Sequence, residues 1–270
     1  MDAELSDVAL ALAAAGAGAE VVRRAYGGEL TRLAKSGLDF ATDADVDAER
    51  AILSVLRGSR PNDQVVGEES GVTPGLGTRR WLVDPLCGTL NFAAQNPLVA
   101  VNVALVDGDR TTAAVSADPL AGELFWCDES GTHVRTGSGD VAVRPSSASR
   151  LIDVNCDGPS DRPFVGAQLI GDPAFRAAFG PRVLSTTLTL AWVAAGRRAG
   201  YISDGAFLDN VHFAAGIALC QRAGCIVTDL AGEPLHTGRG LIAAADNATH
   251  ERLIALIRPH LDAALAAADL

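Results

Sequence analysis

The sequence lacks a Cys-x-x-Cys pair, and its five cysteines, spread from residue 87 to residue 225, are an odd number. This usage argues against a disulfide framework and favours the reducing cytoplasm. A positively charged start is also missing, and the apolar stretch at residues 8–20 is too short to cross a bilayer. We therefore expect a cytoplasmic protein with no signal peptide and no membrane contact.

Basic residues are few, since 22 Lys and Arg stand against 33 Asp and Glu, a net charge of -11. A general nucleic-acid binder needs a basic face, so we expect no nucleic-acid partner. The 270 residues, 48% of them hydrophobic, can bury one large domain or two tightly joined halves. Residues 135–149 are polar and rich in Gly and Ser, so we place a boundary there, with halves at 1–145 and 146–270.

Hydrophobic spacing predicts a long helix over residues 4–26 and a second helix that begins at Thr42 or Asp43. Val65-Val66 is a short buried strand, and residues 97–106 form a strand that ends in a hairpin turn at 107–109. Residues 111–117 and 123–127 are further antiparallel strands, and His133 is expected on the surface near the start of another. The second half alternates strand and helix, which favours an α/β layer with some parallel pairing.

The most informative stretch runs from Trp81 to Phe92 and reads Trp-Leu-Val-Asp-Pro-Leu-Cys-Gly-Thr-Leu-Asn-Phe. We expect Trp-Leu-Val to be a buried strand that Asp84 ends and that Pro85 cannot continue. Gly88 and Thr89 can then open a helix whose free N–H groups seat a phosphate. An acidic residue beside such donors can hold a cation and a phosphate together.

This stretch resembles the Asp-Pro-x-Asp-Gly-Thr-x-Asn-Phe signature of the inositol monophosphatase family. Other stretches resemble that family in the right order, from about residue 10 to about residue 245. They are Thr42 to Glu49 (Thr-x-x-Asp-x-x-x-Glu), Gly67-Glu68-Glu69 (Gly-Glu-Glu), Val183 to Arg197 (Gly-Ser-x-x-Leu-x-Leu-x-x-Val-Ala-x-Gly-Arg), Val211 to Gly216 (Trp-Asp-x-Ala-Ala-Gly) and Arg222 to Cys225 (Glu-Ala-Gly-Gly). The resemblance implies a layered αβαβα fold of the α/β class and a homodimer.

The resemblance also implies functional residues. One Mg²⁺ ion would be held by Glu68, Asp84 and the carbonyl of Leu86, and Asp45 would help to orient the attacking water. The N–H groups of Gly88 and Thr89, and the Thr89 hydroxyl, would lie near the phosphate and this water. Ser185 and Arg222 would contact the substrate.

Two departures fall on the family's second metal site, where Cys87 and His212 replace aspartates. Thiolate and imidazole suit zinc or a similar softer metal better than Mg²⁺. A cysteine beside a histidine is also the minimal arrangement for nucleophilic catalysis. Alternatively, Cys87 only fills space, and His212 caps a helix or lies on the surface.

A third departure is Arg222, which replaces a glutamate. Arginine can only donate hydrogen bonds, so an anionic or carbonyl-bearing substrate suits it better than plain inositol phosphate, unless its side chain points to solvent.

Three functions follow from these observations. The first is a metal-dependent phosphomonoesterase acting on a small phosphorylated metabolite, such as a sugar, cyclitol or nucleotide phosphate. The second is an enzyme on the same fold that uses a Cys87–His212 pair for nucleophilic or acid/base catalysis. The third is a catalytically inactive binding or scaffolding protein.

Overall fold

The computed structural model describes residues 5–35, 40–157, 165–205, 207, 210–235 and 238–268. The chain divides into two compact units. The first comprises Met1–Ala142 with two short later segments, Thr186–Leu188 and Val211–Leu219, and the second comprises Val143–Ser185, Thr189–Asn210 and Cys220–Leu270. Two stretches from the second half of the sequence therefore belong to the first unit.

An eight-stranded sheet forms the centre of the first unit, in the order β10-β9-β8-β7-β6-β5-β3-β4. Its strands are β3 (Gln64–Gly67), β4 (Gly71–Thr73), β5 (Arg79–Cys87), β6 (Ala100–Asp107), β7 (Arg110–Asp118), β8 (Glu123–Asp128), β9 (Gly131–Thr136) and β10 (Gly139–Ala142). β3 and β5 pair in parallel, and the remaining neighbours pair antiparallel. β1 (Arg32–Ala34) and β2 (Phe40–Thr42) form a separate antiparallel hairpin.

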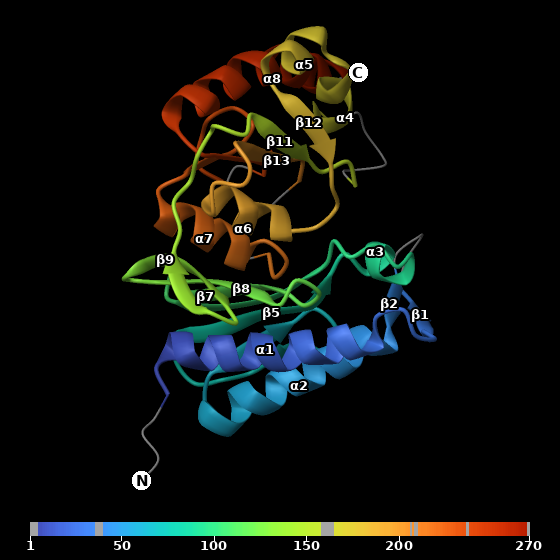
Figure 1. Cartoon of the computed structure of the whole chain (residues 1–270), viewed down its shortest axis with the longest axis vertical. Helices are drawn as coiled ribbons and strands as arrows, with labels where there is room; N and C mark the ends of the chain where they lie inside the picture. Colours follow the sequence, from blue (N-terminus) through green and yellow to red (C-terminus); the bar gives the residue numbers. More distant parts are fainter. Residues whose placement is uncertain are drawn as a thin grey trace. The chain divides into compact units, whose positions relative to one another are not determined.

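Helices α1 (Asp7–Ala25) and α2 (Asp43–Ser59) lie side by side across one face of this sheet (Figure 1). Ser6 caps α1 by accepting the N–H of Ala9, and Thr42 is the N-cap residue of α2. Both helices bury an apolar stripe against Trp81, Leu105 and other side chains of the sheet. The two predicted helices and the strands after residue 97 are confirmed.

The strand expected to end at Asp84 continues to Cys87, so that prediction was wrong. β5 pairs with β6 through Asp84↔Asn102 and resumes at Cys87↔Ala100, with a register shift between them. Pro85 lies inside this irregularity, where no ladder hydrogen bond needs its missing N–H. The helix expected next is confirmed as α3 (Thr89–Ala93), with Gly88 as its N-cap at a φ of 97°.

The polar stretch at 135–149, where we placed a boundary, begins inside β9 and contains β10. The long first segment of the first unit ends within it, at Ala142. One further expectation was wrong, that His133 lies on the surface. His133 is half-buried in β9, and its ring stacks on Trp126 with the ring centroids 4.3 Å apart. The antiparallel pairing of β8 with β9 places the two side chains opposite each other.

A five-stranded sheet forms the second unit, in the order β12-β11-β13-β15-β14. Its strands are β11 (Leu151–Val154), β12 (Gly180–Val183), β13 (Gly200–Ser203), β14 (Ile226–Thr228) and β15 (Leu241–Ala244). β11 pairs in parallel with both neighbours, which confirms the expected parallel pairing, and the other pairs are antiparallel.

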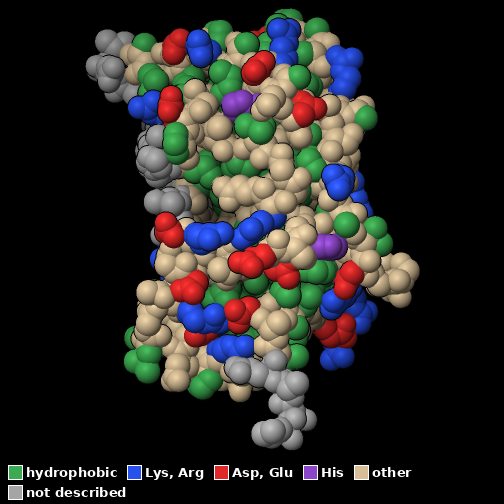
Figure 2. Space-filling view, turned by 90° about the vertical axis from the view of Figure 1, so that its left-hand side faces the viewer, with side chains coloured by type: hydrophobic (Ala, Val, Ile, Leu, Met, Phe, Trp, Pro, Cys, Tyr) green, Lys and Arg blue, Asp and Glu red, His purple; other side chains and the backbone are tan. Residues whose placement is uncertain are grey.

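Helices α4 (Val165–Gly171), α5 (Pro173–Ala178) and α8 (Asn247–Ala268) bury their apolar side chains against this sheet. Helices α6 (Leu188–Ala194) and α7 (Ala214–Ala223) carry residues of both units. Basic and acidic side chains are interspersed over the face of the molecule seen in Figure 2. None of the helices, as far as they are described, is long and apolar enough to cross a membrane.

Candidate active site

Acidic side chains of the first unit meet where the pairing between the parallel strands β3 and β5 ends. Gly67 pairs with Val83, and the N–H of Glu68 donates to the Val83 carbonyl at 3.0 Å. This register places Glu68, the residue after β3, beside Asp84 of β5. The carboxyl ends of parallel strands share one edge of the sheet, so the strand pairing itself brings the two carboxylates together.

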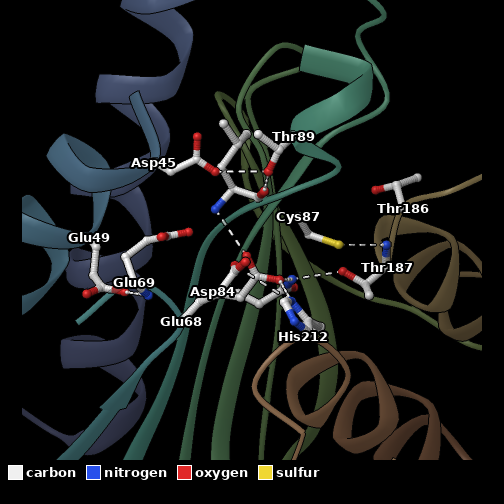
Figure 3. A network of polar contacts seen from close by, with 12 residues as sticks. Asp45, Glu49, Glu68, Glu69, Asp84, Cys87, Thr89, Thr186, Thr187 and His212 are labelled. Carbon is white, nitrogen blue, oxygen red and sulfur yellow. Dashed lines mark hydrogen bonds and ion pairs between the residues drawn. The ribbon is translucent and has the colours of Figure 1, made fainter. Parts of the chain in front are cut away.

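The carboxylate of Asp84 is fully buried at the centre of this group (Figure 3). Its Oδ1 accepts the N–H of Leu86 at 3.1 Å, and its Oδ2 lies 2.9 Å from His212 Nδ1. Ligand atoms of Glu68, Asp84 and His212 all lie within 4.8 Å of one another. The structure therefore joins three of the sequence-predicted residues, with His212 contacting Asp84 directly.

Two basic side chains, Lys35 and His212, lie next to the acidic groups of this site. Lys35 Nζ lies 2.9 Å from Glu68 Oε1 and 2.7 Å from Glu69 Oε1. Burial and the neighbouring Asp84 charge raise the pKa of Glu68 to about 8, against the opposing effects of His212 and Lys35. Burial lowers the pKa of His212, but the hydrogen bond and charge of Asp84, with Glu68, outweigh it and raise this pKa to about 9.

The hydroxyl of Thr89 links the start of α3 to the start of α2. Its Oγ1 lies 3.0 Å from Asp45 Oδ1 and 3.2 Å from the Leu86 carbonyl oxygen. Asp45 is buried, and its other oxygen accepts the Thr42 N–H at 2.8 Å. Burial raises the pKa of Asp45, although its hydrogen bonds with Thr42 and Thr89 oppose that shift. Asp45, Leu86 and Thr89 thus form one connected network.

The thiol of Cys87 is directed elsewhere. Its Sγ accepts the backbone N–H of Thr187 at 3.3 Å, and the Thr187 hydroxyl in turn accepts from Asn102 at 2.8 Å (Figure 3). Burial and the charge of Asp84 raise the pKa of Cys87 well above that of an ordinary thiol. The described contacts therefore pair His212 with Asp84 and Cys87 with Thr187, and Cys87 does not belong to the group that Asp84 and His212 form with Glu68.

Three contributors were missed in the sequence. The sequence indicated only that Lys35 belongs to a turn at residues 35–37. Residues 36 and 37 of this turn lie outside the described part of the chain. Asn102 belongs to no motif, and Thr187 occupies an unspecified position of the Val183 to Arg197 motif, so only their apolar surroundings could have drawn attention to them. Asp209 lies three residues before His212 and could be mistaken for the metal-binding aspartate that His212 replaces, but it is outside the described residues.

Ser185 and Arg222 belong to the second unit. Ser185 precedes α6, and Arg222 lies half-buried in the last turn of α7. Their contacts with substrate remain predictions.

An α/β fold whose adjacent parallel strands bring buried acidic side chains together defines this class of protein. A model of the inositol monophosphatase family matches residues 2–262, and the chain belongs to that family. The expected family and the expected fold class are confirmed. This family is Mg²⁺-dependent and has a phosphatase fold.

The chain resembles particular relatives along most of its length. It is 34% identical over 242 residues to the Nus factor SuhB of Escherichia coli, covering 86% of this chain and 87% of that protein. It is 31% identical to the inositol-1-monophosphatase of Caulobacter vibrioides, covering 86% of this chain and 93% of the relative. The crystal structure of extragenic suppressor protein suhB from Bartonella henselae matches with a TM-score of 0.81 and 30% identity, covering 92% and 96% of the two chains.

Proposed function

We propose that this protein is an Mg²⁺-dependent phosphomonoesterase that hydrolyses a small phosphorylated metabolite at Glu68, Asp84 and Leu86. The observation that carries the proposal is the crowding of Glu68 and Asp84, which places a half-buried and a fully buried carboxylate oxygen within 4.8 Å of each other. Oxygen is the donor that Mg²⁺ prefers, and the Leu86 carbonyl is a third candidate oxygen. These residues fit one ion.

The family's second ion position does not offer a comparable set of donors. Cys87 supplies a thiol that faces the Thr187 N–H, and His212 supplies a nitrogen bound to Asp84. Neither a thiol nor an imidazole is a preferred Mg²⁺ ligand. A softer metal would need both Cys87 and His212, but the Cys87 thiol lies outside the group formed by Glu68, Asp84 and His212. We therefore propose a single Mg²⁺ ion and do not retain zinc.

The remaining residues position water and phosphate. When bound, the ion supplies Lewis-acid polarisation of the phosphate oxygens and acidifies coordinated water. Asp45 accepts a hydrogen bond from the Thr89 hydroxyl or, when that hydroxyl donates to the Leu86 carbonyl instead, a hydrogen bond from the attacking water. Gly88 is the N-cap and Thr89 the first residue of α3, and the N–H groups at a helix start have no partner within the helix, so both are available to phosphate oxygens. The side chains of Glu68 and Asp84 hold the ion.

The alternative enzyme based on Cys87 and His212 loses support from the contacts of both side chains. A thiol with a raised pKa that accepts a backbone N–H is a poor nucleophile.

A catalytically inactive protein is the outcome that the activity test below would reveal. The Nus-factor name belongs to the relatives, and we propose no nucleic-acid partner for this acidic chain. By family likeness we keep the homodimer and the substrate contacts of Ser185 and Arg222 in the proposal.

Phosphate release from a panel of sugar, cyclitol and nucleotide monophosphates tests the function. We expect release that requires Mg²⁺, stops with a chelator, and is lost in Asp84→Asn and Glu68→Gln. The exposed Asp47 of α2 provides the matched control, because Asp47→Asn removes an acidic group outside the cluster. Release that persists in Asp84→Asn, or no release from the folded wild-type chain on any substrate, would contradict the proposal.

A further inference from the structure

A cavity of about 710 Å³ lies in the first unit between strand β1, helix α2 and the turn joining β3 to β4. Its volume is in the range of small-molecule sites. We propose that it binds a small amphipathic organic anion, with the anionic group on Arg57 and the apolar body against Leu33, Val46 and Leu53. Lys35 and Glu68 also line the cavity, so it adjoins the proposed ion site, but the proposed ligand is not the phosphorylated substrate.

The wall formed by α2 is one continuous stripe of the helix. Its residues follow the spacing i, i+3, i+4, i+7, i+8 and i+11, namely Val46, Glu49, Arg50, Leu53, Ser54 and Arg57. At a rise of about 1.5 Å per residue, this stripe is roughly 16 Å long. It is therefore long enough to align an elongated ligand along the helix.

Apolar side chains cover much of the cavity. Leu33 of β1 lines it and is 45% exposed, unusually open for a leucine in a strand. Val46 is half-buried and adds further apolar surface, whereas Ala41 of β2 and Leu53 line the wall but are already nearly buried. An aromatic or aliphatic group placed here would remove this surface from water, which favours binding.

The acidic residues in the wall already have partners. Glu49 accepts the N–H groups of Glu69 and Ser70 at 2.9 and 2.8 Å. Lys35 offsets one of the two negative charges of Glu68 and Glu69. The anionic group is therefore placed at Arg57, which lies eight residues after Glu49 on the stripe, about 12 Å along the helix axis.

Arg57 is a basic residue of the cavity wall whose guanidinium group can still bind an anionic ligand. Its described contact is a hydrogen bond of 2.8 Å from Nη2 to the Thr73 hydroxyl, and no carboxylate of the described residues forms an ion pair with it. Arg50, seven residues earlier, pairs with Asp47 at 2.6 Å. The guanidinium fork binds carboxylates and sulfonates through two parallel hydrogen bonds. A neutral ligand would leave this group unused, and a purely polar anion would leave the apolar wall exposed.

Isothermal titration calorimetry with anilinonaphthalenesulfonate tests the proposal on the full-length chain. We expect saturable binding of one molecule per chain and at least a tenfold weaker affinity in Arg57→Gln. Arg24→Gln is the matched control, because Arg24 is also an exposed arginine in the last turn of a helix, and it should bind as the wild type does. Ser54→Trp, which fills the cavity from an exposed position, should also weaken binding.

Anilinonaphthalene, which lacks the sulfonate, measures the role of charge. It should bind wild type more weakly than the sulfonate does, and equally well in Arg57→Gln. Equal affinity of the sulfonate for wild type and Arg57→Gln, or no saturable binding by wild type, would overturn the proposal. Thermal unfolding of each variant verifies that an affinity change does not come from loss of folded protein.

Discussion

The hydroxyl of Thr89 has one proton and two acceptors, Asp45 Oδ1 and the Leu86 carbonyl. It therefore connects the residue proposed to orient water with a residue proposed to hold the ion. Removing it leaves Asp45 buried with one fewer hydrogen-bond donor and leaves the water without a fixed neighbour.

We expect Thr89→Ala to lower kcat by about 10²-fold, the lower end of what a positioned proton acceptor contributes. Thr89→Ser keeps the hydroxyl and should retain most of the activity. Steady-state phosphate release measures both, and thermal unfolding controls for folding. If Thr89→Ala were as active as Thr89→Ser, the hydroxyl would have no role in positioning the water.

At the scale of elements, α2 holds the β3–β4 turn that carries Glu68. The buried carboxylate of Glu49, from α2, accepts the N–H groups of Glu69 and Ser70. Gly67 permits this approach, because a Cβ there would come within 2.7 Å of the Glu49 carboxylate. The position of Glu68 therefore depends on a helix that contributes no proposed ligand to the ion.

Glu49→Gln should reduce the free energy of unfolding by about 1–3 kcal/mol, because an amide can accept with only one of its two terminal groups. We also expect weaker Mg²⁺ binding, since Glu68 follows the same turn. Chemical denaturation and calorimetric titration with Mg²⁺ measure the two effects. Unchanged stability and unchanged ion affinity together would show that Glu49 does not fix the turn.

In the second unit, strand β11 carries a buried acid. Asp153 pairs with Arg198 at 3.0 Å, yet burial raises the pKa of Asp153 to about 6, and Arg198 only partly offsets that shift. Between its usual value of 3.8 and about 6, the folded chain binds a proton that the unfolded chain has released. The contribution of Asp153 to the free energy of unfolding therefore falls as the pH rises through this window and is constant above it.

Asp153→Asn removes this titration. We expect the stability of wild type relative to the variant to fall by up to about 3 kcal/mol between about pH 4 and about pH 6. Urea unfolding at a series of pH values measures the difference. A difference that is independent of pH, or that grows with rising pH, would contradict the assignment.

At the scale of the whole molecule, the sequence predicted the family, the α/β class and most of the elements. The resemblance to the family implied that Glu68 and Asp84 share a site, and the parallel pairing of β3 with β5 brings the two residues together. The path of the chain at Pro85 was not predictable from propensity, because the register shift that accommodates the proline depends on pairing with β6.

Side-chain orientation was less accessible from the sequence than strand order. Alignment with one family site predicted that Cys87 and His212 converge, whereas their described contacts are with Thr187 and Asp84. Lys35 reaches the cluster from outside the core sheet, after β1, and no local pattern identifies such a long-range contact. These directions depend on tertiary packing, which a motif does not encode.

The central claim is that Glu68 and Asp84 hold a single divalent ion, and counting bound Mg²⁺ by calorimetric titration tests it most directly. The account predicts one ion per wild-type chain, no ion in Asp84→Asn, and a second ion when Cys87→Asp and His212→Asp restore the family's oxygen donors. A folded wild-type chain that binds no Mg²⁺, or two ions, would contradict it.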